Sequence, residues 1–171
     1  NGELCQAGEV GNIGVHLSTP ALFKEYYKDP ERTLSQRKGE YFITGDRASK
    51  DEEGFFWFEG RSDDIIISSG YTIGPFEVED ALIKHPAVKE CAVIGSPDAI
   101  RGNIVKSFIV LTESYKQHSE KELIAELQSF VKTLTAPYKY PRSIEFTESL
   151  PKTTSGKIRH VQLREMELSK D

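Results

Sequence analysis

The pattern of hydrophobic and polar positions divides the chain near residue 60. Before that point the sequence is rich in glycine and contains short strand-like runs at residues 12–17, 39–43 and 55–58, the last of them aromatic. These runs predict the strands of a small barrel or sheet. After residue 60, strand-like runs alternate with helical patterns, which predicts a compact α+β domain from about residue 63 onward.

Helix signals are clearest in this second part. Pro75, followed by an acidic first turn, predicts a helix that ends near residues 85–86. Ser119 and Glu122 have the spacing of a capping box. The apolar residues after them recur on one helix face and predict core packing: Leu123, Ile124, Leu127, Phe130, Val131 and Leu134. A last short helix is predicted near residues 161–168.

Strands are expected between these helices. The β-branched run at residues 65–67 is followed by apolar stretches at 88–94 and 105–111, which a polar turn separates. A further strand is predicted at 143–147. The expected fold is therefore α+β: the tail of a β-rich subdomain, then a small domain with a short central sheet flanked by helices.

Composition and charge exclude several classes of protein. The 171 residues are 37% hydrophobic and 29% charged, as in ordinary globular proteins, and the net charge of -5 argues against a nucleic-acid partner. Apolar runs stay well below the roughly 20 residues that span a bilayer, and the N-terminus does not have the pattern of a signal peptide. We expect a cytoplasmic protein, or a mitochondrial-matrix protein if the source is eukaryotic. The abrupt opening and the single methionine, Met166, suggest a piece of a longer protein.

Cysteine and histidine patterns predict neither a metal site nor a triad hydrolase. Cys5 and Cys91 lie far apart in sequence, and the apolar surroundings of Cys91 predict a buried, inert thiol. The four histidines have no metal-ligand spacing, and none lies beside a plausible nucleophile.

Lys157 ends a run of small residues, PKTTSGK at 151–157, that predicts a mobile loop. An ammonium on such a loop suits a transient anion such as an acyl phosphate. The alternative is an ordinary solvated loop lysine.

Asp46 and Arg61 are candidates for contact with a nucleotide. Asp46 follows a Thr-Gly turn at the end of an apolar strand, where a carboxylate can accept hydrogen bonds from ribose hydroxyls. Its alternative is a turn aspartate that bonds its own backbone. Arg61 is able to clamp a phosphate or ribose oxygen, or else to form an ion pair with Asp63 or Asp64.

Two further segments combine features of binding sites. Residues 68–75 contain glycines that permit close approach and an aromatic face at Tyr71, although a hairpin turn also explains them. Residues 136–142, with Lys132 before them, gather cations and aromatics, as a binder of a nucleotide with several phosphates does. A solvated linker is the alternative.

Three segments together resemble the last core motifs of the adenylate-forming superfamily: residues 41–46 (YFITGD), 60–79 and 151–157. Residues 65–71 (IIISSGY) and 136–142 (APYKYPR) are most similar to medium-chain acyl-CoA synthetases and their acetyl-CoA synthetase relatives. The resemblance covers nearly the whole chain. It implies a ligase in which a carboxylate attacks the α-phosphate of MgATP to give acyl-AMP, after which the CoA thiol displaces AMP.

The resemblance also implies roles in the first half-reaction. Asp46 would hold the ribose hydroxyls, Arg61 would contact the ribose and phosphates, and Lys157 would bridge the substrate carboxylate and α-phosphate. Asp63 matches the hinge about which a small domain rotates between half-reactions. In related CoA synthetases the lysine equivalent to Lys157 is switched off by acetylation, which implies a protein lysine acetyltransferase as a possible partner.

For the second half-reaction the resemblance implies contacts with CoA. Ser69, Gly70 and Tyr71 would lie near the pantetheine, and weaker similarity suggests Arg101, Lys132 and Tyr140 for the nucleotide end. Thr72 departs from the pattern, since many relatives have arginine there to meet an anionic group of the substrates. Its presence puts one phosphate contact in doubt.

The same resemblance assigns residues 1–62 to the end of a large N-terminal domain and residues 63–171 to the mobile C-terminal domain. The phosphate loop, the acyl pocket and the Mg²⁺-binding glutamate of the family would lie upstream, so we expect the isolated fragment to be inactive. Two alternatives are an adenylation domain that loads a carrier protein and a nucleotide-binding module without catalysis.

Overall fold

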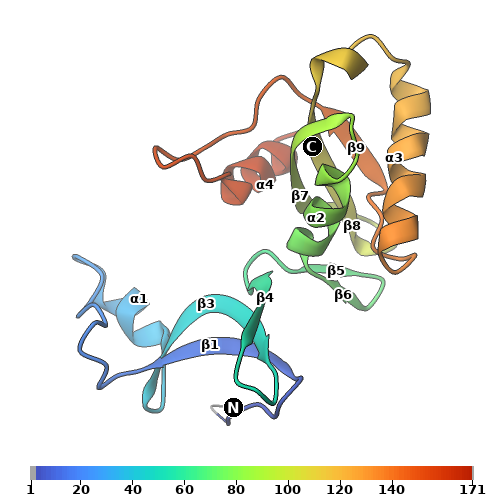
Figure 1. Cartoon of the computed structure of the whole chain (residues 1–171). Helices are drawn as coiled ribbons and strands as arrows, with labels where there is room; N and C mark the ends of the chain where they lie inside the picture. The colour runs from blue at the N-terminus through green and yellow to red at the C-terminus, as the bar shows by residue number, and fades with distance from the viewer. Residues whose placement is uncertain (1–2, 171) are drawn as a thin grey trace. The chain divides into compact units, whose positions relative to one another are not determined.

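The chain folds into two compact units, one ending at Asp63 and the other beginning at Asp64 (Figure 1). The structure, a computed structural model, describes residues 3–170. Each unit combines helix with sheet, which confirms the predicted α+β class. No helix in this part of the chain is long and apolar enough to cross a membrane.

The first unit is built around one long strand, β3, which pairs with β1 along one edge and with β2 and then β4 along the other. A short helix precedes the sheet strands β2 to β4; its first residue is Pro30, and Asp29 caps it by accepting a hydrogen bond from the Arg32 N–H at 3.1 Å. The elements of this unit are β1 (Val10–His16), α1 (Pro30–Ser35), β2 (Arg37–Lys38), β3 (Tyr41–Lys50) and β4 (Phe56–Arg61).

The predicted end of a strand at residues 44–46 is wrong, because β3 continues through it to Lys50. The register across β1 and β3 shifts there, so that residues 44–46 of β3 lie opposite Ile13 alone. Gly45 adopts a φ of 85°, and the Thr44 hydroxyl donates to the Ile13 carbonyl at 3.3 Å. A bulge therefore absorbs the extra residues, and the glycine bends the strand without ending it.

The second unit contains a five-stranded sheet in the order β6-β5-β8-β7, with β9 parallel to β8. Its strands are β5 (Ile66–Ser68), β6 (Tyr71–Ile73), β7 (Val88–Asp98), β8 (Gly102–Leu111) and β9 (Ser143–Phe146). The predicted strands are present, but β7 and β8 are longer than expected. They form one antiparallel ladder from the pair Val88 and Leu111 to the pair Asp98 and Gly102.

Within the described residues of this unit, three α-helices flank the sheet: α2 (Pro75–Ile83), α3 (Glu120–Leu134) and α4 (His160–Leu168). Glu113–Tyr115 forms a 3₁₀ turn. The start of α2 at Pro75 is as predicted. Ser119 does occupy the N-cap of α3, but its hydroxyl makes no capping hydrogen bond, so the predicted capping box is not formed. The first turn closes through the backbone instead, since the Leu123 N–H donates to the Ser119 carbonyl at 3.0 Å.

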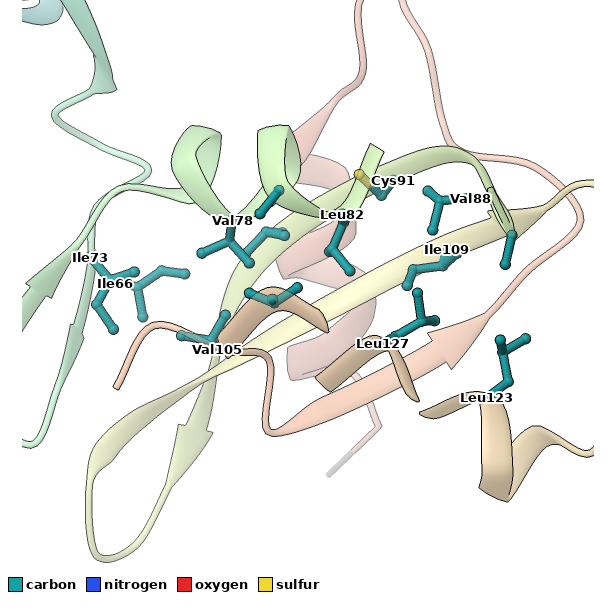
Figure 2. Close-up of a cluster of buried hydrophobic side chains, with 14 residues drawn as sticks. Ile66, Ile73, Val78, Leu82, Val88, Cys91, Val105, Ile109, Leu123 and Leu127 are labelled. Carbon is teal, nitrogen blue, oxygen red and sulfur yellow. The ribbon is translucent and has the colours of Figure 1, made fainter. Parts of the chain in front are cut away.

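Alternate residues of β8 pack into two separate cores. Val105 and Ile109 join a cluster with α2 and α3, which includes Leu82 and Leu127 (Figure 2). Phe108 and Val110 join a second cluster with Leu150 and with Leu163 of α4. Because successive side chains of a strand point to opposite faces, the helices α2 and α3 cover one face of the sheet and α4 the other.

The core face of α3 provides a test of this packing. Leu127 is fully buried, whereas Leu134 of the same helix is 50% exposed. We expect Leu127→Ala to lower the free energy of unfolding by about 2–5 kcal/mol, because it removes buried methyl groups and leaves a cavity. Urea denaturation measures this value. The matched variant Leu134→Ala should cost well under half as much, and an equal cost for the two would contradict the assignment.

Candidate functional site

Asp46 and Arg61 lie opposite each other on β3 and β4. The Arg61 guanidinium donates from Nη1 to Asp46 Oδ1 at 3.1 Å and from Nε to Asp63 Oδ1 at 3.0 Å. The ion pair with Asp63 that the sequence suggested is therefore present, while Asp64 pairs instead with Arg164. One guanidinium thus joins the two carboxylates expected at the ribose and at the hinge.

The bulge at Gly45 makes room for this arrangement. A Cβ atom at Gly45 would lie 2.7 Å from Arg61 Nη2, so the guanidinium lies against the bare backbone of the bulge. The Gly45 carbonyl accepts hydrogen bonds from both the N–H and the hydroxyl of Ser62, each at 2.9 Å. These bonds fix the residue after Arg61 to the strand that bears Asp46.

Lys157 lies at the end of a tight turn in the second unit. Lys152 and Ile158 pair across the turn as an isolated bridge, and the Thr153 N–H donates to the Lys157 carbonyl at 2.8 Å. The Thr153 hydroxyl accepts from the Lys157 N–H at 3.1 Å. The Lys157 side chain is exposed, and no other residue among 3–170 forms an ion pair with it. The ammonium is therefore available to an external anion.

The segment predicted near pantetheine forms the β5–β6 hairpin. Ser69 and Gly70 make its turn with φ values of 49° and 81°, so the hairpin interpretation of this sequence holds. The Ser69 N–H donates to the Arg101 carbonyl at 3.0 Å. The ring of Tyr71 stacks on that of Tyr138, with centroids 4.2 Å apart. The two predicted CoA-binding segments are thus side by side.

A cluster of cations surrounds Tyr140. Lys132 Nζ lies 3.9 Å from the centroid of its ring, and Arg142 Nη1 donates to its hydroxyl at 2.8 Å. Arg142 was not singled out from the sequence, where it is one of several cations in a linker. The pKa of Asp98 is lowered by hydrogen bonds from the backbone N–H groups of Arg101 and Ile100, and by the charges of Arg101 and Arg142. Asp98 is thus influenced both by Arg101 and by Arg142, one of the cations around Tyr140.

The two cysteines differ in burial. Cys91 is buried as expected, and burial together with the charge of Glu79 raises the pKa of its thiol to about 12. Cys5 is exposed. No group of three or more metal-ligating side chains occurs in the described residues.

Comparison with known proteins shows which proteins this chain is similar to. The domain family described as "AMP-binding enzyme C-terminal domain" matches residues 77–157. An uncharacterized acyl-CoA ligase of Bacillus subtilis, YtcI, is 70% identical over 98% of the chain. The mitochondrial acyl-coenzyme A synthetase ACSM3 of Rattus norvegicus is 53% identical, also over 98%. The match spans 31% and 29% of these two relatives, so the chain covers about a third of their length.

Solved structures agree with this classification. An anthranilate CoA ligase, AuaEII, in complex with anthranoyl-AMP has a TM-score of 0.83 at 41% identity, covering 97% of this chain and 32% of its own. ATP-bound MatB from Rhodopseudomonas palustris has a TM-score of 0.82 at 32% identity, covering 95% and 31%. The chain therefore contains an AMP-binding enzyme C-terminal domain of the adenylate-forming superfamily, and it is similar to acyl-CoA ligases over nearly all of its length.

The contact between Gly45 and Arg61 is testable with two alanine variants. Gly39 also has a positive φ, 56°, but a Cβ at this position would meet no described atom within 4 Å, whereas one at Gly45 would meet Arg61. Both Gly45→Ala and Gly39→Ala should lower the free energy of unfolding by about 1–2 kcal/mol, the cost of a left-handed alanine. Only Gly45→Ala should also displace the guanidinium and shift the Arg61 Nε–H resonance in an NMR spectrum. An unmoved resonance would disprove the contact.

Proposed function

We propose that this chain is the C-terminal portion of an ATP-dependent acyl-CoA synthetase, which activates a short- or medium-chain carboxylic acid as acyl-AMP and transfers the acyl group to CoA. The observation that carries the proposal is the arrangement of charges: Asp46 is fixed to Arg61 on a sheet, and Lys157 lies on a turn without a counter-ion among residues 3–170. Identity to acyl-CoA ligases over 98% of the chain supports it.

In the first half-reaction, Asp46 accepts hydrogen bonds from the ribose hydroxyls and Arg61 contacts the ribose and phosphate region. The ion pair between them at 3.1 Å orients the carboxylate. Lys157 lies between the substrate carboxylate and the α-phosphate, where negative charge gathers as the acyl-phosphate bond forms. A cation at that point stabilises the transition state more than the separated reactants.

In the second half-reaction, rotation about Asp63 withdraws Lys157 and brings the β5–β6 hairpin to the CoA thiol. Residues 1–62 are then the end of a large domain and residues 63–171 the mobile domain, and the division of the chain into two units at this point supports the assignment. Ser69, Gly70 and Tyr71 contact the pantetheine. The nucleotide end meets the cations around Tyr140, with Lys132, Arg101 and, by its position, Arg142.

The remaining components belong to the rest of the protein. In the proposed enzyme, Mg²⁺, pyrophosphate and the acyl chain are bound by other parts of the full-length protein. We place the protein in the cytoplasm, or in the mitochondrial matrix if the source is eukaryotic. The names of the ACSM relatives, which are mitochondrial, support the second location for a eukaryotic source.

The 171-residue chain alone should be catalytically silent. It contains Lys157 but spans about a third of the relatives' length. We expect no acyl-CoA when the chain is incubated with ATP, Mg²⁺, CoA and straight-chain acids from acetate to octanoate, whereas the full-length protein should form it. Chromatographic detection of acyl-CoA with the chain alone would refute this expectation.

Lys157→Ala in the full-length protein should separate the two half-reactions. Loss of the ammonium should lower ATP–pyrophosphate exchange by about 10²-fold or more, as for other groups that stabilise developing charge. Thioester formation from supplied acyl-AMP should be largely spared. Acetylation of Lys157, which we also propose, removes the same charge and should have the same effect.

The control for this variant is Lys121→Ala, which removes an exposed lysine from the first turn of α3. It should leave both half-reactions unchanged. Equal losses in the two half-reactions of Lys157→Ala would disprove the specific role of the lysine. If the full-length protein transferred the acyl group to a carrier-protein thiol but not to CoA, the proposed function would be wrong and the protein would be an adenylation domain that loads a carrier protein.

A further inference from the structure

Two ion pairs anchor the turn that carries Lys157, one on each of its stems. Before the turn, Lys152 Nζ lies 2.8 Å from Glu90 Oε2 on β7. After it, His160 Nε2 lies 2.7 Å from Glu79 Oε1 on α2. Between them the Arg159 N–H donates to the Pro151 carbonyl at 2.9 Å, which ties the stems together. The position of the turn is therefore set by contacts at its base.

The pair between His160 and Glu79 is the more enclosed of the two. Their side chains are 21% and 19% exposed, compared with 39% and 32% for Lys152 and Glu90. Glu79 Oε1 also accepts a hydrogen bond from the Val93 N–H at 2.8 Å, so this carboxylate is held against β7. His160 thereby connects the first residue of α4 to both α2 and the central sheet.

The charges around His160 balance only when its ring is protonated. Glu79 faces it from α2, while Asp64 and Arg164 form an ion pair beside it. The thiol of Cys91 donates to the Glu79 carbonyl and, with a pKa of about 12, adds no charge near neutral pH. Two cations then face two anions. A neutral imidazole would leave the group with a net negative charge in a partly buried place, which is unfavourable.

The pKa of His160 is raised from its ordinary value of 6.5, chiefly by the hydrogen bond to Glu79, while burial opposes the shift. A raised pKa in the folded state means that the pair contributes its full stability below pH 6.5, the unfolded value. The contribution is lost as the pH rises through the folded pKa. The anchor on α2 therefore weakens as the pH rises above 6.5 and through this raised pKa.

We infer that His160 is a positioning residue for the first half-reaction: its charged contact with Glu79 holds the stem of the Lys157 turn on α2 and so fixes the ammonium at the reacting groups. The inference rests on the proposed function. When the contact is lost, the Lys152–Glu90 pair and the packing of Ile158 still hold the turn, but its second stem has lost its link to α2. A misplacement of about 1 Å is enough to lower the rate of a reaction by about 10²-fold.

His160→Gln in the full-length protein tests this inference. We expect the turnover number of ATP–pyrophosphate exchange to fall by about 10-fold or more near pH 6, with a smaller change in KM, because substrate-binding residues are untouched. Thioester formation from supplied acyl-AMP should be retained. The wild-type exchange rate should decline as His160 deprotonates, and this decline should be absent from the variant.

His160→Arg keeps a cation that does not titrate below pH 10 or so. It should restore most of the exchange activity and remove the decline of the rate with rising pH. His118→Gln is the matched control, since His118 is an exposed histidine whose ring stacks on Tyr115 and forms no ion pair with a carboxylate among the described residues. This control should reproduce the wild-type rate and pH profile. Glu79→Gln, which keeps an acceptor for the Val93 N–H, should resemble His160→Gln and provides a second variant if that one unfolds.

The outcomes of these variants distinguish a positioning role of His160 from a merely structural one. A wild-type rate and pH profile in His160→Gln would overturn the positioning role, and so would equal losses in both half-reactions, which indicate general destabilisation of the second unit. A decline with rising pH that persists unchanged in His160→Arg would show that another group titrates, and would also overturn the inference. Failure of the wild-type protein to form acyl-AMP would instead refute the proposed function. Lys157→Ala is measured in the same exchange assay: if it loses activity while His160→Gln does not, only the inference about His160 fails and the proposed function stands.

Discussion

The ladder between β7 and β8 is the constraint on which the second unit depends. Its residues are buried on both faces of the sheet, with Ile109 in one core and Phe108 in the other. A shift of the register by one residue would exchange these two sets of side chains, so the two cores fix the register together. The polar segments take their positions from the same ladder: the Arg142 N–H donates to the Val105 carbonyl at 2.8 Å, and the Lys157 turn extends from a stem whose Ile158 packs on the second core.

Local signals predicted the elements well, and tertiary pairing explains where they failed. Pro75 and the apolar stripe at Leu123, Leu127 and Val131 identified two helices, because their effects act within one or two turns. The Thr-Gly pair at residues 44–45 looks like the end of a strand in isolation. Pairing with β1 and β4 continues the strand across it, and such pairing cannot be read from residues 44–46 alone.

The same distinction applies to the site. Motif resemblance singled out Asp46, Arg61 and Lys157, whose roles stay predictions, and the β3–β4 register explains why the first two meet. Other contacts join residues whose sequence neighbourhoods give no such signal. His160 reaches Glu79 across 81 positions. Lys106, which is buried, is held by Glu145 at 2.9 Å and Glu167 at 2.6 Å. Burial has the largest single effect on its pKa and lowers it, but the hydrogen bonds and charges of the two carboxylates together raise the pKa above its ordinary value. Such ion pairs follow from the packing of α4 on the sheet, which must be known first.

The composition of the Lys157 turn has a geometric cause. Gly156 has a φ of 85°, which favours glycine, and the Thr153 hydroxyl closes the turn by accepting the Lys157 N–H. Small hydroxyl residues and a glycine are thus what a tight turn between two anchored stems requires, and their presence alone does not indicate mobility. A lysine at the end of such a turn loses little backbone entropy when it meets an anion, because folding has already ordered its main chain. In the proposed first half-reaction, the anchors at the base therefore act through the geometry that they impose on Lys157, a residue they do not contact.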